Sequence, residues 1–228
     1  MKTSLTIQID TPGRTKLQEL GQKVAIVKSF LDAPKYPVVC IVFQPFGPNN
    51  VVKFISDYYV YASGLQFSPG KTVVMNESQL VSGGSTYTFT GITFDQGKTG
   101  LPPNTYGVSN QRTDKENLTI GLAQEVINEV DGDGKKHIFP INVAVVPFNE
   151  TIYFKPLEEV QVFVASGMNN SEVIQSFYLQ PSRSPVGVGS EYQNIVGKYL
   201  AVDFSKDPSQ TIYYDNVNNI FALGPLPK

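Results

Sequence analysis

The chain has 228 residues, a formal net charge of −2, 17% charged residues and 41% hydrophobic residues. This balance, with its scattered basic residues, excludes the concentrated positive surface that nucleic acids require. No apolar stretch is long enough to span a bilayer, and the first residues lack the apolar segment of a signal peptide. We therefore expect a cytoplasmic protein without a transmembrane segment or a nucleic-acid partner, and secretion by another route stays open.

Short β-strands dominate the elements that the residue pattern predicts. Near the start, Leu5, Ile7 and Ile9 alternate with polar residues, which is the period of a half-buried strand. Continuous apolar runs follow, and such runs are typical of strands that lie deep between two sheets. The predicted strands after Ile9 in the first half lie at residues 24–27, 38–43, 51–62 and 72–75.

Helix is scarce in the predicted elements. Residues 15–23 place Leu17 and Leu20 at helical spacing and favour one or two turns. Residues 124–129 are a weaker candidate. Strand continuation or loop is the alternative interpretation of both segments.

A clean alternation at residues 86–90 places Tyr87 and Phe89 on one face of a strand. Beyond Gly91 the apolar residues take the opposite phase, beginning at Ile92. Because one inserted residue shifts the phase of a strand, the pattern predicts a β-bulge at Gly91. The second half closes with predicted strands at 200–204, 211–214 and 220–223.

The chain repeats short phrases at an offset of about one hundred residues, which is the length of a whole small β domain. The matching segments are residues 4–7 and 117–120, 42–46 and 144–148, and 60–64 and 163–167.

The repeat predicts an all-β fold made of two tandem, internally duplicated antiparallel β-sandwich domains. We expect the first domain at residues 1–97 and the second at residues 117–228. Residues 98–116 are polar and contain proline and glycine, which favours a linker or a crossover. The length of this segment also favours a packed connection or an edge strand around residues 106–108.

The catalytic residue types are few. The one cysteine, Cys40, lies in an apolar run and is expected in the core. The one histidine is His137, and the sequence contains no nucleophile-elbow motif that would supply a serine partner for it. Glu158 and Glu159 are adjacent, so a strand would point them to opposite faces. We therefore name no catalytic residue, metal ligand or cofactor, and the interpretation leans away from an enzyme.

Two aspartates, Asp131 and Asp133, alternate with glycine and leave two interpretations open. Closely spaced carboxylates suit calcium, whereas Asp-Gly is a strong hairpin-turn dipeptide. Lys135 and Lys136 follow directly and would repel a cation, which favours the turn.

Tyrosine is the most suggestive residue type, since the chain has 12 Tyr and no Trp. Adjacent tyrosines on a strand place one ring on each face, and exposed rings beside amides and carboxylates suit sugar recognition. Cross-strand pairing of tyrosines is the alternative interpretation. The candidate ligand-binding residues are Asp57, Tyr58, Tyr59, Tyr61, Tyr213 and Tyr214.

These features favour a non-enzymatic, lectin-like protein that recognises a carbohydrate or a glycoconjugate through Tyr-rich polar surfaces. One alternative is a self-assembling structural protein or a membrane-active, pore-forming β protein that forms homo-oligomers through exposed strand edges. A further alternative is an enzyme with its pocket between the two domains.

Overall fold

The computed structural model describes residues 2–31, 36–130, 134–174 and 195–227. Within these ranges the chain forms one helix, α1 (Thr11–Glu19), and strands in three sheets, so the all-β class is confirmed. α1 has nine residues, and the described ranges contain no helix with the length and apolar character needed to cross a bilayer.

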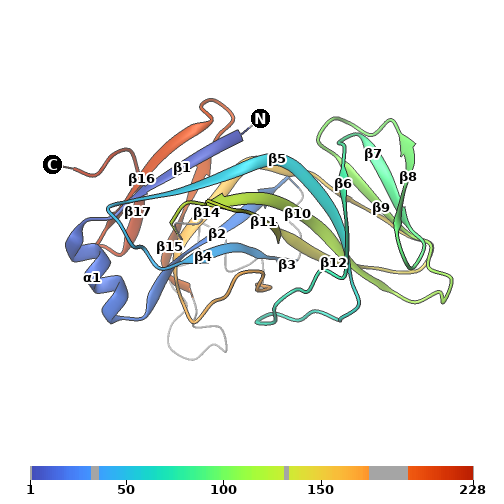
Figure 1. The fold of residues 1–228 in the computed structure, drawn as a ribbon, viewed down its shortest axis with the longest axis horizontal. Coiled ribbons are helices and arrows are strands. Elements are labelled where there is room, and N and C mark those ends of the chain that lie inside the picture. Colours follow the sequence, from blue (N-terminus) through green and yellow to red (C-terminus); the bar gives the residue numbers. More distant parts are fainter. Residues whose placement is uncertain (1, 32–35, 131–133, 175–194, 228) are drawn as a thin grey trace.

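The largest sheet runs along much of the length of the molecule and curves strongly (Figure 1). Two further strands extend it beside its central members, β11 next to β10 and β6 next to β5. In sheet order its strands are β17 (Ile220–Leu223), β16 (Ser209–Asp215), β1 (Lys2–Gln8), β5 (Asn49–Ser63), β10 (Leu118–Asn128), β12 (Asn142–Val146) and β3 (Tyr36–Pro37), with β11 (Lys136–Pro140) and β6 (Glu77–Val81) at the sides.

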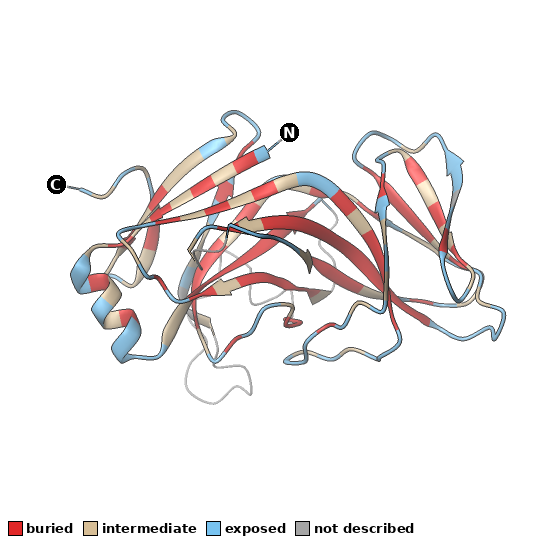
Figure 2. Cartoon of the chain, viewed as in Figure 1, coloured by how far each residue is buried: buried red, intermediate tan, exposed pale blue. Residues whose placement is uncertain are grey.

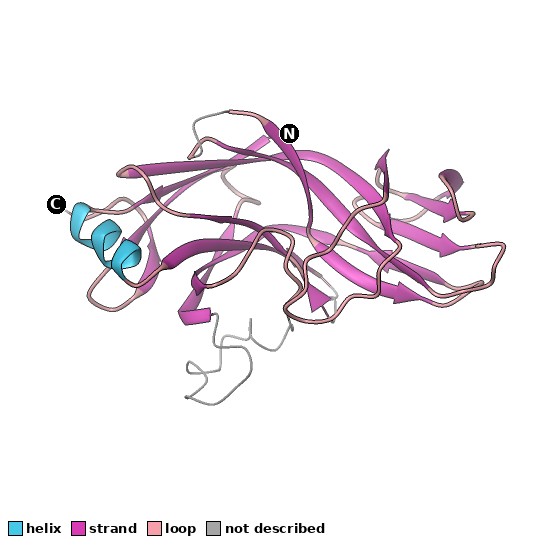
Figure 3. Cartoon of the chain, turned by 60° about the horizontal axis from the view of Figure 1, so that its bottom comes forward, coloured by secondary structure: helices cyan, strands magenta, loops and turns pink. Residues whose placement is uncertain are grey.

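Two sheets of four strands complete the fold. One contains β13 (Thr151–Phe154), β9 (Tyr106–Asn110), β7 (Ser85–Phe89) and β8 (Phe94–Thr99), in that order. The other contains β15 (Ile195–Asp203), β14 (Pro156–Ser166), β2 (Gln22–Phe30) and β4 (Val39–Phe43). α1 lies at one end of the molecule and the sheet of β7, β8, β9 and β13 at the other (Figure 3).

Strands from the two halves of the chain pair with each other in two sheets. β5 pairs antiparallel with β10 from Ser63 opposite Thr119 to Val52 opposite Asn128. β14 likewise pairs antiparallel with β2 in the second four-stranded sheet. The tandem duplicated sandwich is not confirmed, because the repeated segments lie in strands that share sheets across the expected boundary.

One apolar cluster joins all three sheets. It contains Leu5 and Val52 from the large sheet, Ile26 and Val162 from the sheet of β2 and β14, and Val108 from the sheet of β7 to β9. All five side chains are fully buried. The main core therefore lies between the sheets, and all three sheets contribute side chains to it (Figure 2).

The outer face of the central strands is covered as well. Tyr61, Ala123 and Val143 form a second cluster there with Val73 and Val173, which come from two irregular connections. β10 is buried at ten of its eleven positions as a result. The large apolar residues of β10 still alternate, with Leu118, Ile120 and Leu122 in the main cluster, while the covered outer face takes small residues such as Gly121 and Ala123.

The predicted helix at residues 15–23 begins earlier, at Thr11, and ends at Glu19. Asp10 caps its first turn, because the Asp10 carboxylate accepts a hydrogen bond of 2.7 Å from the Gly13 amide. Leu17 is its buried anchor to the core. The helical interpretation of residues 124–129 is wrong, since β10 continues through Asn128 and the alternative of a continued strand holds.

The predicted bulge at Gly91 is wrong. Gly91 has a positive φ of 115° and lies in the turn between β7 and β8, where the Thr90 amide donates to the Thr93 carbonyl. Phe89 and Phe94 face each other across the hairpin. The alternation of apolar residues changes phase at Gly91 because the chain turns back there into the next strand. In the sequence, such a hairpin turn gives the same one-residue shift of the alternation as a bulge would give.

Two further segments differ from the predicted elements. Residues 73–75 lie in a connection and not in a strand, and Val73 packs its side chain against the outer face of the large sheet. The segment at residues 106–108 does form a strand, β9, as expected. β9 is an interior strand, however, because it pairs with both β13 and β7.

Candidate functional site

A pocket of about 380 Å³ opens where the end of β5 and the start of β6 meet the turn between β7 and β8. The loop that leads into β10 closes its remaining side. Its polar lining includes Ser63, Asn76, Glu77 and Arg112, and its apolar lining includes Phe89 and Ile92.

The β7–β8 turn supplies the apolar wall. Phe89 is buried and its ring centroid lies 4.9 Å from that of Phe94, so the base of the hairpin is fixed by an aromatic pair. Ile92 stands at the tip and is 81% exposed. An aliphatic side chain this exposed on a tight turn offers a free apolar surface at the mouth of the pocket.

Hydrogen bonds to Asn76 fix the opposite wall. The Gly64 amide donates to the Asn76 side-chain oxygen at 2.7 Å, and the Asn76 amide donates to the Ala62 carbonyl at 2.9 Å. These bonds close the long connection between β5 and β6. Glu77 is thereby placed as the first residue of β6, opposite Ala62.

Arg112 lies in the loop before β10, and carboxylates surround its guanidinium group. Its Nε donates to Asp114 at 2.9 Å and its Nη2 donates to the second Asp114 oxygen. Its Nη1 faces the Asn117 carbonyl at 3.5 Å. Because the guanidinium donates these bonds, the pKa of the Asp114 carboxyl lies below its ordinary value.

The residues predicted from the sequence as ligand-binding lie outside this pocket. On β5, Tyr58 and Tyr61 are buried, Tyr59 is half-buried and Asp57 is exposed. The Tyr61 hydroxyl donates to the Asn142 carbonyl at 2.6 Å, and burial raises its pKa well above the ordinary value.

The second tyrosine pair lies on β16, which β1 separates from β5. Tyr213 is half-buried. Tyr214 is buried, and its hydroxyl donates to the Asn219 side-chain oxygen at 2.8 Å. The fold therefore does not gather the six predicted residues into one surface.

The remaining candidates from the sequence lie elsewhere. Cys40 is buried in the core as expected, and desolvation raises the pKa of its thiol to about 12. Asp131 and Asp133 lie outside the described residues. In the ranges that the structure describes, no three His, Cys, Asp or Glu side chains gather as a metal site would require.

A buried polar group also interrupts the core. Lys28 on β2 is 2% exposed, and its Nζ lies 3.9 Å from Glu158 of β14. Burial lowers the pKa of Lys28, and the nearby Glu158 carboxylate opposes that shift. Glu158 and Glu159 serve different partners, since Glu159 accepts a hydrogen bond of 2.7 Å from the Ser29 hydroxyl.

The sequence carries no short-range signal of the pocket. Its lining comes from residues 62 to 118, and it forms only when β5, β6 and the β7–β8 hairpin come together. No family model, curated protein or solved structure matches the chain. The functional argument therefore depends on the pocket's own geometry and chemistry.

Proposed function

We propose that the protein is a non-enzymatic, lectin-like carbohydrate-binding protein and that the pocket at the β5–β6 junction holds the sugar. The supporting observation is the lining, which combines a carboxylate, an amide and a guanidinium group with an exposed aliphatic side chain. Its volume of about 380 Å³ lies within the range of small-molecule sites and suits one or two sugar rings.

The two kinds of lining match the two kinds of surface on a sugar ring. The C–H face of the ring is apolar and would pack on Ile92 with Phe89 behind it. The ring hydroxyls both donate and accept hydrogen bonds. Glu77 accepts, while the Asn76 amide group and the remaining Arg112 N–H donate.

The tyrosine-rich surface proposed from the sequence stays a separate proposal. Its accessible members are Asp57 and the half-buried Tyr59 and Tyr213. Asp57 and Tyr59 lie on β5, in the same strand whose far end reaches the pocket at Ser63. A longer glycan could extend from the pocket toward these residues.

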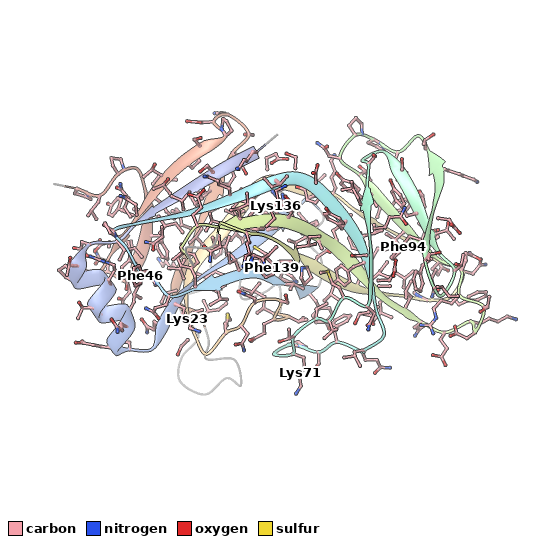
Figure 4. All side chains as sticks on the ribbon, viewed as in Figure 1. Lys23, Phe46, Lys71, Phe94, Lys136 and Phe139 are labelled. Atoms are coloured by element: carbon pink, nitrogen blue, oxygen red, sulfur yellow. The ribbon has the colours of Figure 1, made fainter. Side chains whose placement is uncertain are left out.

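A glycan array probed with the labelled protein tests the proposal, and the matched variants are Ile92→Ser and Phe46→Ser. Both residues are more than 80% exposed, so neither change should affect folding. Figure 4 places Phe46 beside α1, at the other end of the molecule from the pocket. We expect Ile92→Ser to weaken binding about tenfold, which corresponds to about 1.4 kcal/mol.

The control Phe46→Ser should bind as tightly as the unchanged chain. An array without any bound glycan would contradict the proposal. Equal binding by the Ile92→Ser variant would move the sugar site away from the pocket.

Self-assembly through strand edges is the second candidate function. Leu80 on β6 and Tyr153 on β13 are more than half exposed, and β13 is an edge strand of its sheet. Unpaired strand edges with apolar side chains favour association. Mass measured against protein concentration separates this function from sugar binding by a monomer.

A further inference from the structure

The charges at the pocket are unbalanced in favour of carboxylates. Arg112 is the one cation in the described lining, and it is already paired with Asp114. A second carboxylate, Glu116, lies 4.0 Å from the same guanidinium. Glu77 adds a third negative charge directly on the pocket wall.

Arg112 has little capacity left for an anionic ligand. Its Nε and Nη2 both donate to Asp114, and its Nη1 faces the Asn117 carbonyl. An arginine binds a carboxylate or a phosphate through its two-pronged edge, and Asp114 occupies that edge here. Arg112 therefore presents a neutralised, flat group to the pocket.

Glu77 is the charged group that remains for a ligand. It is half-buried, and it takes part in none of the ion pairs among the described residues. The neighbouring Asn76 oxygen is already bound to the Gly64 amide, so it does not compete for a cation. A carboxylate without an ion-pair partner gains from a ligand that brings the opposite charge and a hydrogen-bond donor.

We propose that the sugar held in this pocket is an amino sugar whose protonated amine pairs with Glu77. This inference rests on the proposed function and specifies its ligand class. The apolar wall at Ile92 receives the ring, and the carboxylate excess around Arg112 repels uronic and sialic acids. Glucosamine oligomers are the simplest sugars with this chemistry.

Calorimetric titration with three oligosaccharides of equal length tests the inference. The ligands are a glucosamine trimer, its N-acetylated counterpart and a uronic acid trimer, at about pH 6, where a free amine is protonated. We expect the glucosamine trimer to bind at least tenfold more tightly than the acetylated one, and the uronic acid not to bind. High ionic strength should weaken only the glucosamine complex.

Glu77→Gln keeps the shape of the side chain and removes its charge, so it should bring the glucosamine and acetylated trimers to equal affinity. Glu19→Gln, on α1 at the other end of the molecule, is the matched control and should change nothing. A linear polyamine serves as a competitor that has charge but no ring. Competition by the polyamine as strong as that by the glucosamine trimer would overturn the inference, because the site would then recognise positive charge without the sugar ring.

The two proposals fail in different ways. Tighter binding of the acetylated trimer, with no effect of Glu77→Gln, would overturn the amino-sugar inference and keep the lectin-like function. Absence of binding to every oligosaccharide and every arrayed glycan would overturn both. The ligand comparison on the unchanged chain needs no variant, so it holds even if Glu77→Gln fails to fold.

Discussion

Gly121 lies at a crowded point of the large sheet. A Cβ atom built on this glycine would contact the Asn142 carbonyl oxygen and approach the Tyr61 hydroxyl to 2.7 Å. These two groups are hydrogen-bonded to each other inside the outer cluster. Glycine is required here for close approach, since no positive φ is involved.

Gly121→Ala should therefore destabilise the protein by about 1–3 kcal/mol, because the added methyl group must displace backbone or the Tyr61 ring. Urea unfolding followed by fluorescence measures the change. The matched control is Gly47→Ala, where the nearest atom would lie 3.6 Å from the new Cβ. A stability equal to that of the control would show that the sheet relaxes around the methyl group.

Single residues also show what a sequence can and cannot predict. Adjacent tyrosines had to point to opposite faces of β5, and Tyr58 and Tyr59 do pack against different clusters. Solvent exposure did not follow, because packing covers both faces of that strand. The covering residues come from connections such as the one carrying Val73, whose position depends on the whole fold.

At the scale of elements, β2 and β14 carry the ion pair between the buried Lys28 and the exposed Glu158, beside a register shift between Pro156 and Val160. Lys28 is almost fully buried, whereas the Glu158 side chain is 47% exposed. The lysine thus loses most of its hydration, and one partly solvated carboxylate at 3.9 Å offsets only part of that loss.

Lys28→Met should leave stability at neutral pH unchanged or raise it by up to about 4 kcal/mol, because methionine has no charge to desolvate. The pKa of Lys28 is lowered from 10.5 in the folded state, so the unfolded chain binds more protons between the two pKa values. The stability of the unchanged chain therefore rises with pH in that window. The advantage of the variant should shrink as pH approaches 10.5.

Chemical unfolding of both chains measures the difference. The raised pKa of Cys40 makes the unchanged chain lose stability above pH 9, and Lys28 itself influences that pKa, so the two chains are compared from neutral pH up to pH 9. Lys71→Met, at an exposed position, is the control and should stay within about 0.5 kcal/mol at every pH. A loss of several kcal/mol in the Lys28 variant would mean that the ion pair is net stabilising.

Among the elements, the positions of the apolar strands could be predicted from the sequence. The apolar runs at 24–27, 38–43 and 51–62 all lie in strands or span them, because burial leaves its mark locally. Strand partners were not predictable. β6 is polar over its first three residues and buries only Val81, so its two adjacent apolar residues, Leu80 and Val81, gave no alternating signal.

For the whole molecule, the cross-pairing of β5 with β10 and of β2 with β14 links both halves of the chain. The shared apolar cluster links them again. The short phrases that recur in the sequence therefore do not mark separate units, because strands that carry them pair across the expected boundary. Strand partners this distant in the sequence leave no local pattern from which the pairing could be predicted.

We therefore expect a single cooperative unfolding transition, with coincident midpoints by far-ultraviolet and near-ultraviolet circular dichroism. Elements of both halves would lose their sheet partners together. Two separated transitions would instead support independent domains at residues 1–97 and 117–228. Limited proteolysis within residues 98–116 gives a second, independent measure of the same division.

The parallel pairing of β1 with β16 also determines when the large sheet can be completed during synthesis of the chain. Ser4 lies opposite Ser209 and Gln8 opposite Tyr213, so β1 leaves the ribosome long before the strand it pairs with. Until β16 is made, β1 can pair only with β5, and the backbone N–H and C=O groups on its other edge stay without their strand partner. Contacts this distant along a chain make folding slow. During synthesis, the partly made protein should depend on chaperones until residues near Asp215 emerge.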